Sequence, residues 1–202
     1  MLGFSKKYDA YILLAGAAFL MWFGGYLREP NYADKRFLVA AEGIEQKPFD
    51  RAVLFVQRHD GEGADALIIN KSSDDPGFAL GGPVETDKLF ALYTPDVEVP
   101  GGTIYEELSI GVGRERAVEY LQGEGPKPKW YVLLKGYAGW YPTQLEDEIR
   151  KGAWKVVEYD FDLLTKTSRE KVWEEANARP AAELKPKDLP AEPKPEPKGR
   201  EY

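Results

Sequence analysis

The residue pair best suited to catalysis is His59 with Asp60, in the sequence HDGEG. Histidine is a common general base in enzymes, and a nearby carboxylate can orient its ring. Adjacent residues on a strand point to opposite faces, however, so these two side chains are poorly placed to act as a dyad. We therefore expect His59 to make structural or loop hydrogen bonds.

A metal or redox site has even less basis in the composition. The chain has one histidine and no cysteine, which excludes disulfides and thiol chemistry. A zinc site would need several carboxylates beside that histidine, and no suitable ligand spacing is present. We predict a protein that is not an enzyme and has no catalytic residues, no cofactor and no metal.

A few polar, aromatic and glycine residues are instead candidates for a pocket or an interaction surface. Asn70 and Gln144 can either line a pocket or cap backbone groups, whereas Trp140 is better suited to the core than to stacking on a ligand. Glycines suit tight turns before they suggest close approach to a ligand. With the histidine pair, the candidate set is His59, Asp60, Asn70, Gly81, Gly82, Tyr137, Trp140 and Gln144.

The most strongly patterned stretch runs from Lys135 to Trp154. An apolar strand is predicted to enter it, followed by a tight turn between Gly136 and Gly139. A helix should then start at Pro142 and be capped by Gly152. Such a junction could hold an anion at the helix start, but acidic side chains crowd the first turn, so we expect no phosphate site there.

Hydrophobic patterning predicts an alternation of short strands and helices in the rest of the domain. The segment 59–66 should be a long glycine-rich turn between two strands of a hairpin. Helices are predicted over 114–122 and 167–178, the second with Ser168 as its N-cap. Strands are expected within 37–44, 49–58, 66–71, 89–93 and 108–112.

The N-terminal segment is predicted to be a membrane anchor. Residues 10–27 include no charged residue, and as a helix they would span about 27 Å of a roughly 30 Å hydrocarbon core. Lys6 and Lys7 also fit the start of a signal peptide, but no convincing cleavage site follows the apolar run. We expect a single-pass protein of the bacterial inner membrane. Basic residues flank both sides of the anchor, so its orientation stays open, with a lean towards a periplasmic domain.

The C-terminal tail and the charge distribution complete the domain plan. Residues 179–202 contain six prolines among alternating lysines and glutamates, so we expect them to be disordered. The net charge is −7, with +1 in residues 1–29 and 0 in residues 180–202, which leaves −8 for residues 30–179. Such an acidic domain is a poor partner for nucleic acid. The predicted parts are the tail and anchor (1–29), a globular domain (30–178) and the tail (179–202).

Four motifs in register resemble the YqgE/AlgH family of bacterial proteins: FLVAAEGI, FDRAVLFVQRHDGEGADALIINK, GGPV, and GYAGW with QLEDEI. The resemblance covers about residues 37–176. It implies a compact α+β domain with a bent, partly barrel-like β-sheet flanked by helices, here preceded by the transmembrane helix. The chain departs from the family pattern at Ser72, where proline is frequent, and at Ala66 and Thr143, where glycine is common.

Family members are often labelled regulators, so the resemblance implies a regulatory rather than a catalytic role. Combined with the predicted anchor, it suggests a membrane-tethered, non-catalytic interaction or regulatory module with a protein partner. Two alternatives stay open: an accessory or scaffold subunit in envelope assembly, and a hydrolase-like enzyme using His59. The sequence does not identify a small-molecule ligand.

Overall fold

The first two strands are buried on both faces. The computed structural model describes residues 33–183, where β1 (Phe37–Ala40) pairs with β2 (Val53–Asp60). Side chains alternate across a strand, so Phe37 and its partner Phe55 face one way, and Leu38 and its partner Leu54 face the other. All four are fully buried. Burial on both faces explains why β1 and the first half of β2 (53–56) read as unbroken apolar runs.

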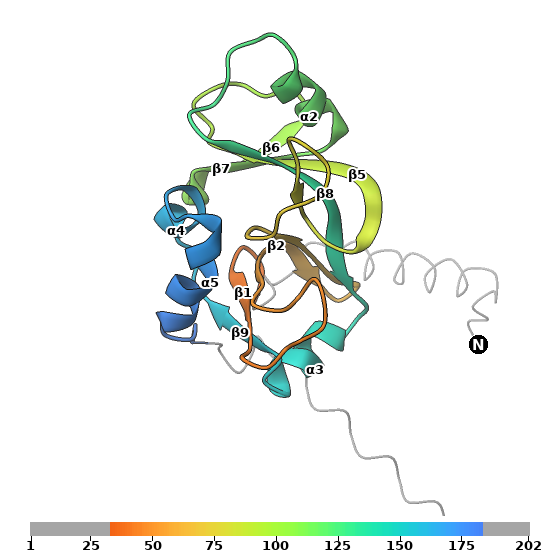
Figure 1. Ribbon diagram of the computed structural model, residues 1–202, viewed down its shortest axis with the longest axis vertical. Helices are drawn as coiled ribbons and strands as arrows, with labels where there is room; N and C mark the ends of the chain where they lie inside the picture. The colour runs from red at the N-terminus through yellow and green to blue at the C-terminus, as the bar shows by residue number, and fades with distance from the viewer. Residues whose placement is uncertain (1–32, 184–202) are drawn as a thin grey trace, which may run out of the picture. The chain divides into compact units, whose positions relative to one another are not determined.

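The remaining strands extend this pair into a single curled sheet (Figure 1). They are β3 (Gly63–Ile68), β4 (Ala79–Leu80), β5 (Val84–Tyr93), β6 (Gly102–Tyr105), β7 (Ile110–Gly113), β8 (Tyr131–Trp140) and β9 (Trp154–Val157). Within residues 33–183 the sheet has nine strands in the order β6-β7-β5-β8-β3-β2-β1-β9, with β4 beside β8. Neighbouring strands are antiparallel except for β4 and β8, which are parallel.

Strand β8 is shared by two half-sheets. Its residues 131–135 pair with β5, and its residues 138–140 pair with β3. We call β6, β7, β5 and the first half of β8 the upper half-sheet, and the second half of β8 with β3, β2, β1 and β9 the lower half-sheet. The two meet at Gly136, whose φ of +67° lies in the left-handed region.

The bend in β8 depends on close contact between two backbone segments. A Cβ atom on Gly136 would lie 2.4 Å from the carbonyl oxygen of Gly82, and one on Gly81 would lie 2.3 Å from the carbonyl oxygen of Gly136. Only glycine leaves room for such an approach. Gly81 and Gly82 therefore pack against the bend.

Helices cover the sheet at three places. Helix α2 (Glu115–Gln122) buries Val118 and Leu121 in a cluster with Tyr93 of β5, and α3 (Gln144–Arg150) buries Leu145 in a cluster with Leu38 of β1. Helices α4 (Phe161–Thr165) and α5 (Arg169–Ala178) pack on the opposite face of β1. There the indole of Trp173 donates a hydrogen bond of 2.9 Å to the carbonyl of Ala40. A short 3-10 helix, η1 (Glu106–Leu108), joins β6 to β7.

The predicted α+β class and curled sheet agree with this architecture, but three local predictions are wrong. Strand β8 continues through the expected turn at Gly136 and Gly139, because Gly136 leaves room for the backbone of Gly82 instead of reversing the chain. The expected loop over 59–66 is a tight hairpin in which β2 extends to Asp60 and β3 starts at Gly63. Helix α3 begins at Gln144 and not at Pro142.

The predicted membrane segment 10–27 lies outside the described residues, as does the predicted tail from residue 184 onward. Within residues 33–183, no helix combines the length and apolar character needed to cross a bilayer. Contacts with the domain continue past the expected boundary at residue 178, since Arg179 forms an ion pair of 2.7 Å with Asp160, and the amide of Ala182 donates to the carbonyl of Val156 at 2.9 Å.

Candidate functional site

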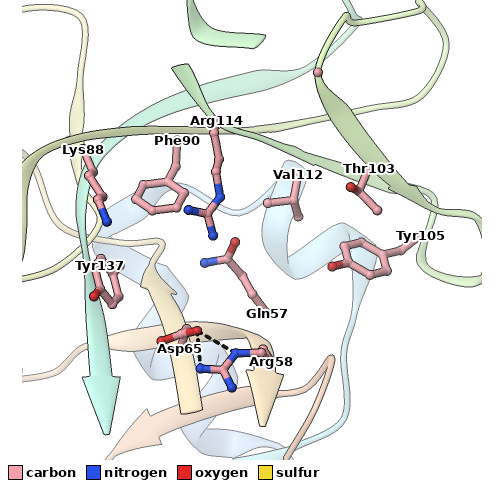
Figure 2. Close-up of a pocket in the computed structure, with 11 residues that line it drawn as sticks. Gln57, Arg58, Asp65, Lys88, Phe90, Thr103, Tyr105, Val112, Arg114 and Tyr137 are labelled. Carbon is pink, nitrogen blue, oxygen red and sulfur yellow. Dashed lines mark hydrogen bonds and ion pairs between the residues drawn. The ribbon is translucent and has the colours of Figure 1, made fainter. Parts of the chain in front are cut away.

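A cavity of about 570 Å³ opens where the two half-sheets meet (Figure 2). Small-molecule sites in proteins typically measure about 300–1,000 Å³, so this cavity has room for a ligand. The lower half-sheet contributes Gln57, Arg58 and Asp65, and β8 contributes Tyr137. The upper half-sheet and its adjoining loops contribute Lys88, Phe90, Gly101, Thr103, Tyr105, Val112 and Arg114.

Two irregularities in strand pairing coincide with the cavity. The β2–β3 register shifts between Val56 and Arg58, at the position of Gln57. The β5–β8 register shifts between Val84 and Leu89, a segment that contains Lys88. Bulges of this kind redirect side chains and are over-represented beside functional sites. Both shifted segments supply a polar side chain to the cavity wall (Figure 2).

The cavity wall carries three cations and one carboxylate. Arg58 is held by two ion pairs, at 2.7 Å to Asp60 and 2.8 Å to Asp65. Lys88 forms an ion pair of 2.6 Å with Glu85, at the rim.

Arg114 is the least neutralised of the three cations. Its guanidinium lies 5.5 Å from the ring centroid of Phe90, within the range of a cation–π interaction. No carboxylate of residues 33–183 lies within 4.0 Å of it. Figure 2 shows Arg114 and Gln57 pointing towards each other across the cavity.

Aromatic rings line two walls of the cavity. Phe90 and Tyr137 make an edge-to-face contact, with ring centroids 6.0 Å apart. Burial and a hydrogen bond with Glu85 raise the pKa of the Tyr137 hydroxyl, so it stays protonated at neutral pH. On the other wall, burial raises the pKa of the Tyr105 hydroxyl. Both phenols are therefore neutral, and the O–H of Tyr137 is donated to Glu85.

His59 lies away from this cavity. Its side chain is 1% exposed, and its Nε2 lies 3.2 Å from Oε1 of Glu146 in helix α3. Burial lowers the pKa of His59, although the Glu146 carboxylate acts in the opposite direction. Burial likewise raises the pKa of the nearby Asp34 carboxyl, against the effects of Lys35 and His59.

Asp60 has a different partner from His59. It is 6% exposed, and besides its ion pair with Arg58 its Oδ1 accepts a hydrogen bond from the amide of Glu62 at 2.9 Å. The His59 ring faces Glu146 and the Asp60 carboxylate faces Arg58, in line with the alternation of side chains along a strand.

Trp140 and Gln144 take part in a network around one carboxylate. Oε2 of Glu148 accepts hydrogen bonds from the indoles of Trp140 at 2.8 Å and Trp154 at 2.7 Å. Oε1 of Glu148 accepts from the Gln144 amide at 2.9 Å, and the Gln144 oxygen accepts from the backbone of Tyr141 at 3.1 Å. This network anchors α3 to the lower half-sheet.

Asn70 also has a structural position. Its Oδ1 accepts from the amide of Val53 at 2.8 Å, and its Nδ2 donates to the carbonyl of Arg51 at 2.9 Å. The side chain therefore ties the segment after β3 to the start of β2. Of the two roles that the sequence leaves open for Asn70, the structure assigns the capping of backbone groups.

Only Tyr137, of the eight candidate residues, lines the cavity, while Gly81 and Gly82 pack behind it at the bend of β8. The sequence-based candidates omit Gln57, Lys88 and Arg114. Gln57 and Arg58 follow the apolar run of β2 directly, and this change from apolar to polar is a weak signal. Nothing comparable marks Lys88 or Arg114. Among residues 33–183, no group of three or more His, Cys, Asp or Glu side chains could hold a metal ion.

Comparisons with known proteins give relatives that belong to one family. The model of the AlgH-like family, DUF179, matches residues 37–185. A UPF0301 protein of Caulobacter vibrioides is 30% identical over 165 residues, which cover 71% of this chain and 85% of the relative. A UPF0301 protein of Methylobacterium sp. (strain 4-46) is 31% identical over 163 residues, which cover 66% of this chain and 77% of the relative.

Two solved structures share the fold. The solution structure of the AlgH protein from Pseudomonas aeruginosa matches with a TM-score of 0.62 and 25% identity, over 75% of this chain and 90% of that protein. A crystal structure from Corynebacterium diphtheriae matches with a TM-score of 0.59 and 21% identity, over 73% of this chain and 87% of that chain. The second similarity concerns the fold alone.

Proposed function

Since this chain belongs to the AlgH-like family, we propose that it is a non-catalytic, membrane-tethered binding module whose small-molecule ligand enters the cavity between its half-sheets. The bound state would then be read by a protein partner, which makes the module regulatory. The tether is residues 10–27, and support for it comes from the uncharged sequence of that segment. The proposed location is the bacterial inner membrane, with the domain on the periplasmic side.

The main support for a binding role is the separation of the cavity from the buried histidine. The cavity presents cations, aromatic rings and an amide, which are groups that hold and orient ligands. The general-base candidate His59 is almost fully buried elsewhere and faces Glu146. A hydrolase role through His59 would require a substrate to reach that buried pair.

The acidic charge of the domain supports a partner other than nucleic acid. Residues 30–179 carry a net charge of −8, which repels a polyanion at long range. A small ligand inside the cavity experiences the local cations instead, because charges a few ångströms away dominate at that distance.

The proposed function can be tested by ligand-observed NMR on the full chain in detergent micelles. A library should contain anionic, cationic and neutral small molecules. Thr103→Trp would fill the cavity from β6, where Thr103 is exposed. Ile104→Trp is the matched control, because the neighbouring side chain on a strand points to the opposite face, and Ile104 is 41% exposed.

We expect some compounds to bind the native chain and the Ile104→Trp variant unchanged, and to lose their saturation-transfer signal with Thr103→Trp. Two results would contradict the proposal. One is that no compound distinguishes the two tryptophan variants. The other is that a compound is converted to product, with loss of turnover in His59→Gln, which would favour the enzyme alternative.

A further inference from the structure

We infer that the cavity selects a small organic anion, with a phosphate or carboxylate group held by Arg114 and Lys88 and an apolar or aromatic body against Tyr105 and Val112. This inference rests on the proposed binding function and specifies the chemistry of its ligand. Phosphate and carboxylate share the anionic oxygens that arginine recognises in a bidentate manner. The test below distinguishes between them.

The cavity wall presents one cation, Arg114, that has no carboxylate partner within 4.0 Å among residues 33–183. Three cations and one carboxylate line the wall, although residues 30–179 carry a net charge of −8. The carboxylate, Asp65, is already paired with Arg58 at 2.8 Å. Arg58 lies between two carboxylates, Asp65 and Asp60, and Lys88 is paired with Glu85, so the uncompensated positive charge of the wall lies with Arg114.

Arg114 is positioned to receive an anion. Its guanidinium lies over Phe90 at 5.5 Å from the ring centroid, which restricts its rotamers before a ligand arrives. Lys88 lines the same wall, next to Phe90 and Tyr137 (Figure 2). Because Lys88 forms an ion pair of 2.6 Å with Glu85, we expect Arg114 to make the larger contribution to anion binding.

Neutral hydrogen-bonding groups complete the polar half of the cavity. The Gln57 side chain makes no hydrogen bond with any residue in 33–183 and points into the cavity towards Arg114 (Figure 2). An amide offers both a donor and an acceptor, so Gln57 can contact the ligand atoms next to the anionic group. The Tyr137 hydroxyl on β8 donates its O–H to Glu85 and adds an acceptor to the cavity wall.

The opposite wall is less polar. Val112 is 9% exposed, and Tyr105 presents a ring beside it, as Figure 2 shows. An inorganic anion would leave this wall in contact with water, whereas an organic body would cover it and gain the free energy of apolar burial. The volume of about 570 Å³ also exceeds what a bare phosphate would fill.

Isothermal titration of the full chain in an uncharged detergent tests the inference. The probes are phenyl phosphate, benzoate, neutral benzamide and inorganic phosphate, with the Thr103→Trp variant giving the background. We expect phenyl phosphate or benzoate to bind at least about tenfold more tightly than benzamide and inorganic phosphate, because only they match both walls. The tighter of the two identifies the anionic group.

Arg114→Gln should weaken binding of the aromatic anions about tenfold to a hundredfold, the range for a hydrogen bond to a charged group. Arg116→Gln is the matched control, since Arg116 is also exposed, lies two residues further on in the first turn of α2 and does not line the cavity. It should change the affinity by less than about twofold, as is usual for a surface charge.

The inference fails if benzamide binds as tightly as the anions, or if the two arginine variants weaken binding equally. The NMR library separates this failure from failure of the proposed function. If neutral or cationic compounds bind the native chain and lose binding in Thr103→Trp, the proposed binding function stands and only the anionic class of ligand is wrong. If Thr103→Trp displaces no compound of any charge, the binding function itself falls.

Discussion

Replacing Gly136 with alanine should destabilise the domain strongly, because the substitution combines two separate penalties. The φ of +67° at Gly136 costs a residue with a Cβ atom about 1–2 kcal/mol. The new methyl group would also lie 2.4 Å from the carbonyl oxygen of Gly82, an atom of the backbone that cannot rotate away. Forcing apart packed segments costs roughly 1–3 kcal/mol. The two penalties sum to about 2–5 kcal/mol of unfolding free energy.

Gly152→Ala is the control that separates the two penalties. Gly152 has a φ of +78°, but no atom lies within 4 Å of its Cβ position. Gly152→Ala should therefore lower the free energy of unfolding only by the conformational cost, about 1–2 kcal/mol.

Thermal unfolding of the full chain, followed by tryptophan fluorescence, measures both variants. For a domain of this size, about 1 kcal/mol shifts Tm by roughly 2–4 °C. We expect Gly136→Ala to lower Tm by about 4–20 °C, and Gly152→Ala by about 2–8 °C. Equal shifts in the two variants would refute the role assigned to close backbone contact at the bend.

Two further perturbations test the region around α3. Glu148→Ala removes the acceptor of two indole hydrogen bonds, at 2.8 Å from Trp140 and 2.7 Å from Trp154. It should lower the free energy of unfolding by about 2–5 kcal/mol, measured by chemical denaturation. A loss below about 1 kcal/mol would show that water replaces the carboxylate. Burial lowers the pKa of His59 from its ordinary 6.5. Below pH 6.5 the unfolded chain therefore binds a proton at this histidine that the folded domain does not bind. The free energy of unfolding should then fall as the pH drops, by at most about 1.4 kcal/mol per pH unit. His59→Gln should reduce that slope in denaturation curves recorded between pH 7 and the lower folded pKa, and an unchanged slope would assign it to other groups.

The sequence predicts best where the local pattern and the tertiary environment agree. The helix predicted over 114–122 matches α2, because Val118 and Leu121 form an apolar face that packs under Tyr93. The predicted closing helix matches α5, with Ser168 at its N-cap position, although the Ser168 side chain makes no capping hydrogen bond.

The error at the expected turn in β8 arises because a glycine has a tertiary function that looks like a local one. Gly136 and Gly139 resemble the two sides of a turn, but the reason for Gly136 is the backbone of Gly82, which lies 54 residues away along the chain. Local sequence carries no information about that contact. Helix α4 also depends on tertiary contacts, because its short apolar segment is stabilised by packing on α5 and β1.

The cavity could not be predicted for a related reason. Its cations come from β2, β5 and the start of α2, and only the topology of the sheet brings these elements together. Arg58, Lys88 and Arg114 each look like an ordinary surface charge in the sequence. By contrast, the structural roles of His59 and Asp60 follow from strand alternation alone.

The shared strand β8 has a mechanical consequence for the proposed ligand. Because the two half-sheets are continuous through β8, rotation of one against the other is concentrated at the bend near Gly136. A ligand that contacts Gln57 on one side and Arg114 on the other would restrain rotation of the two half-sheets about this bend. Binding of the ligand would then make the outer strand β9 more rigid, and because β9 contributes no residue to the cavity, a partner could sense binding there without touching the ligand.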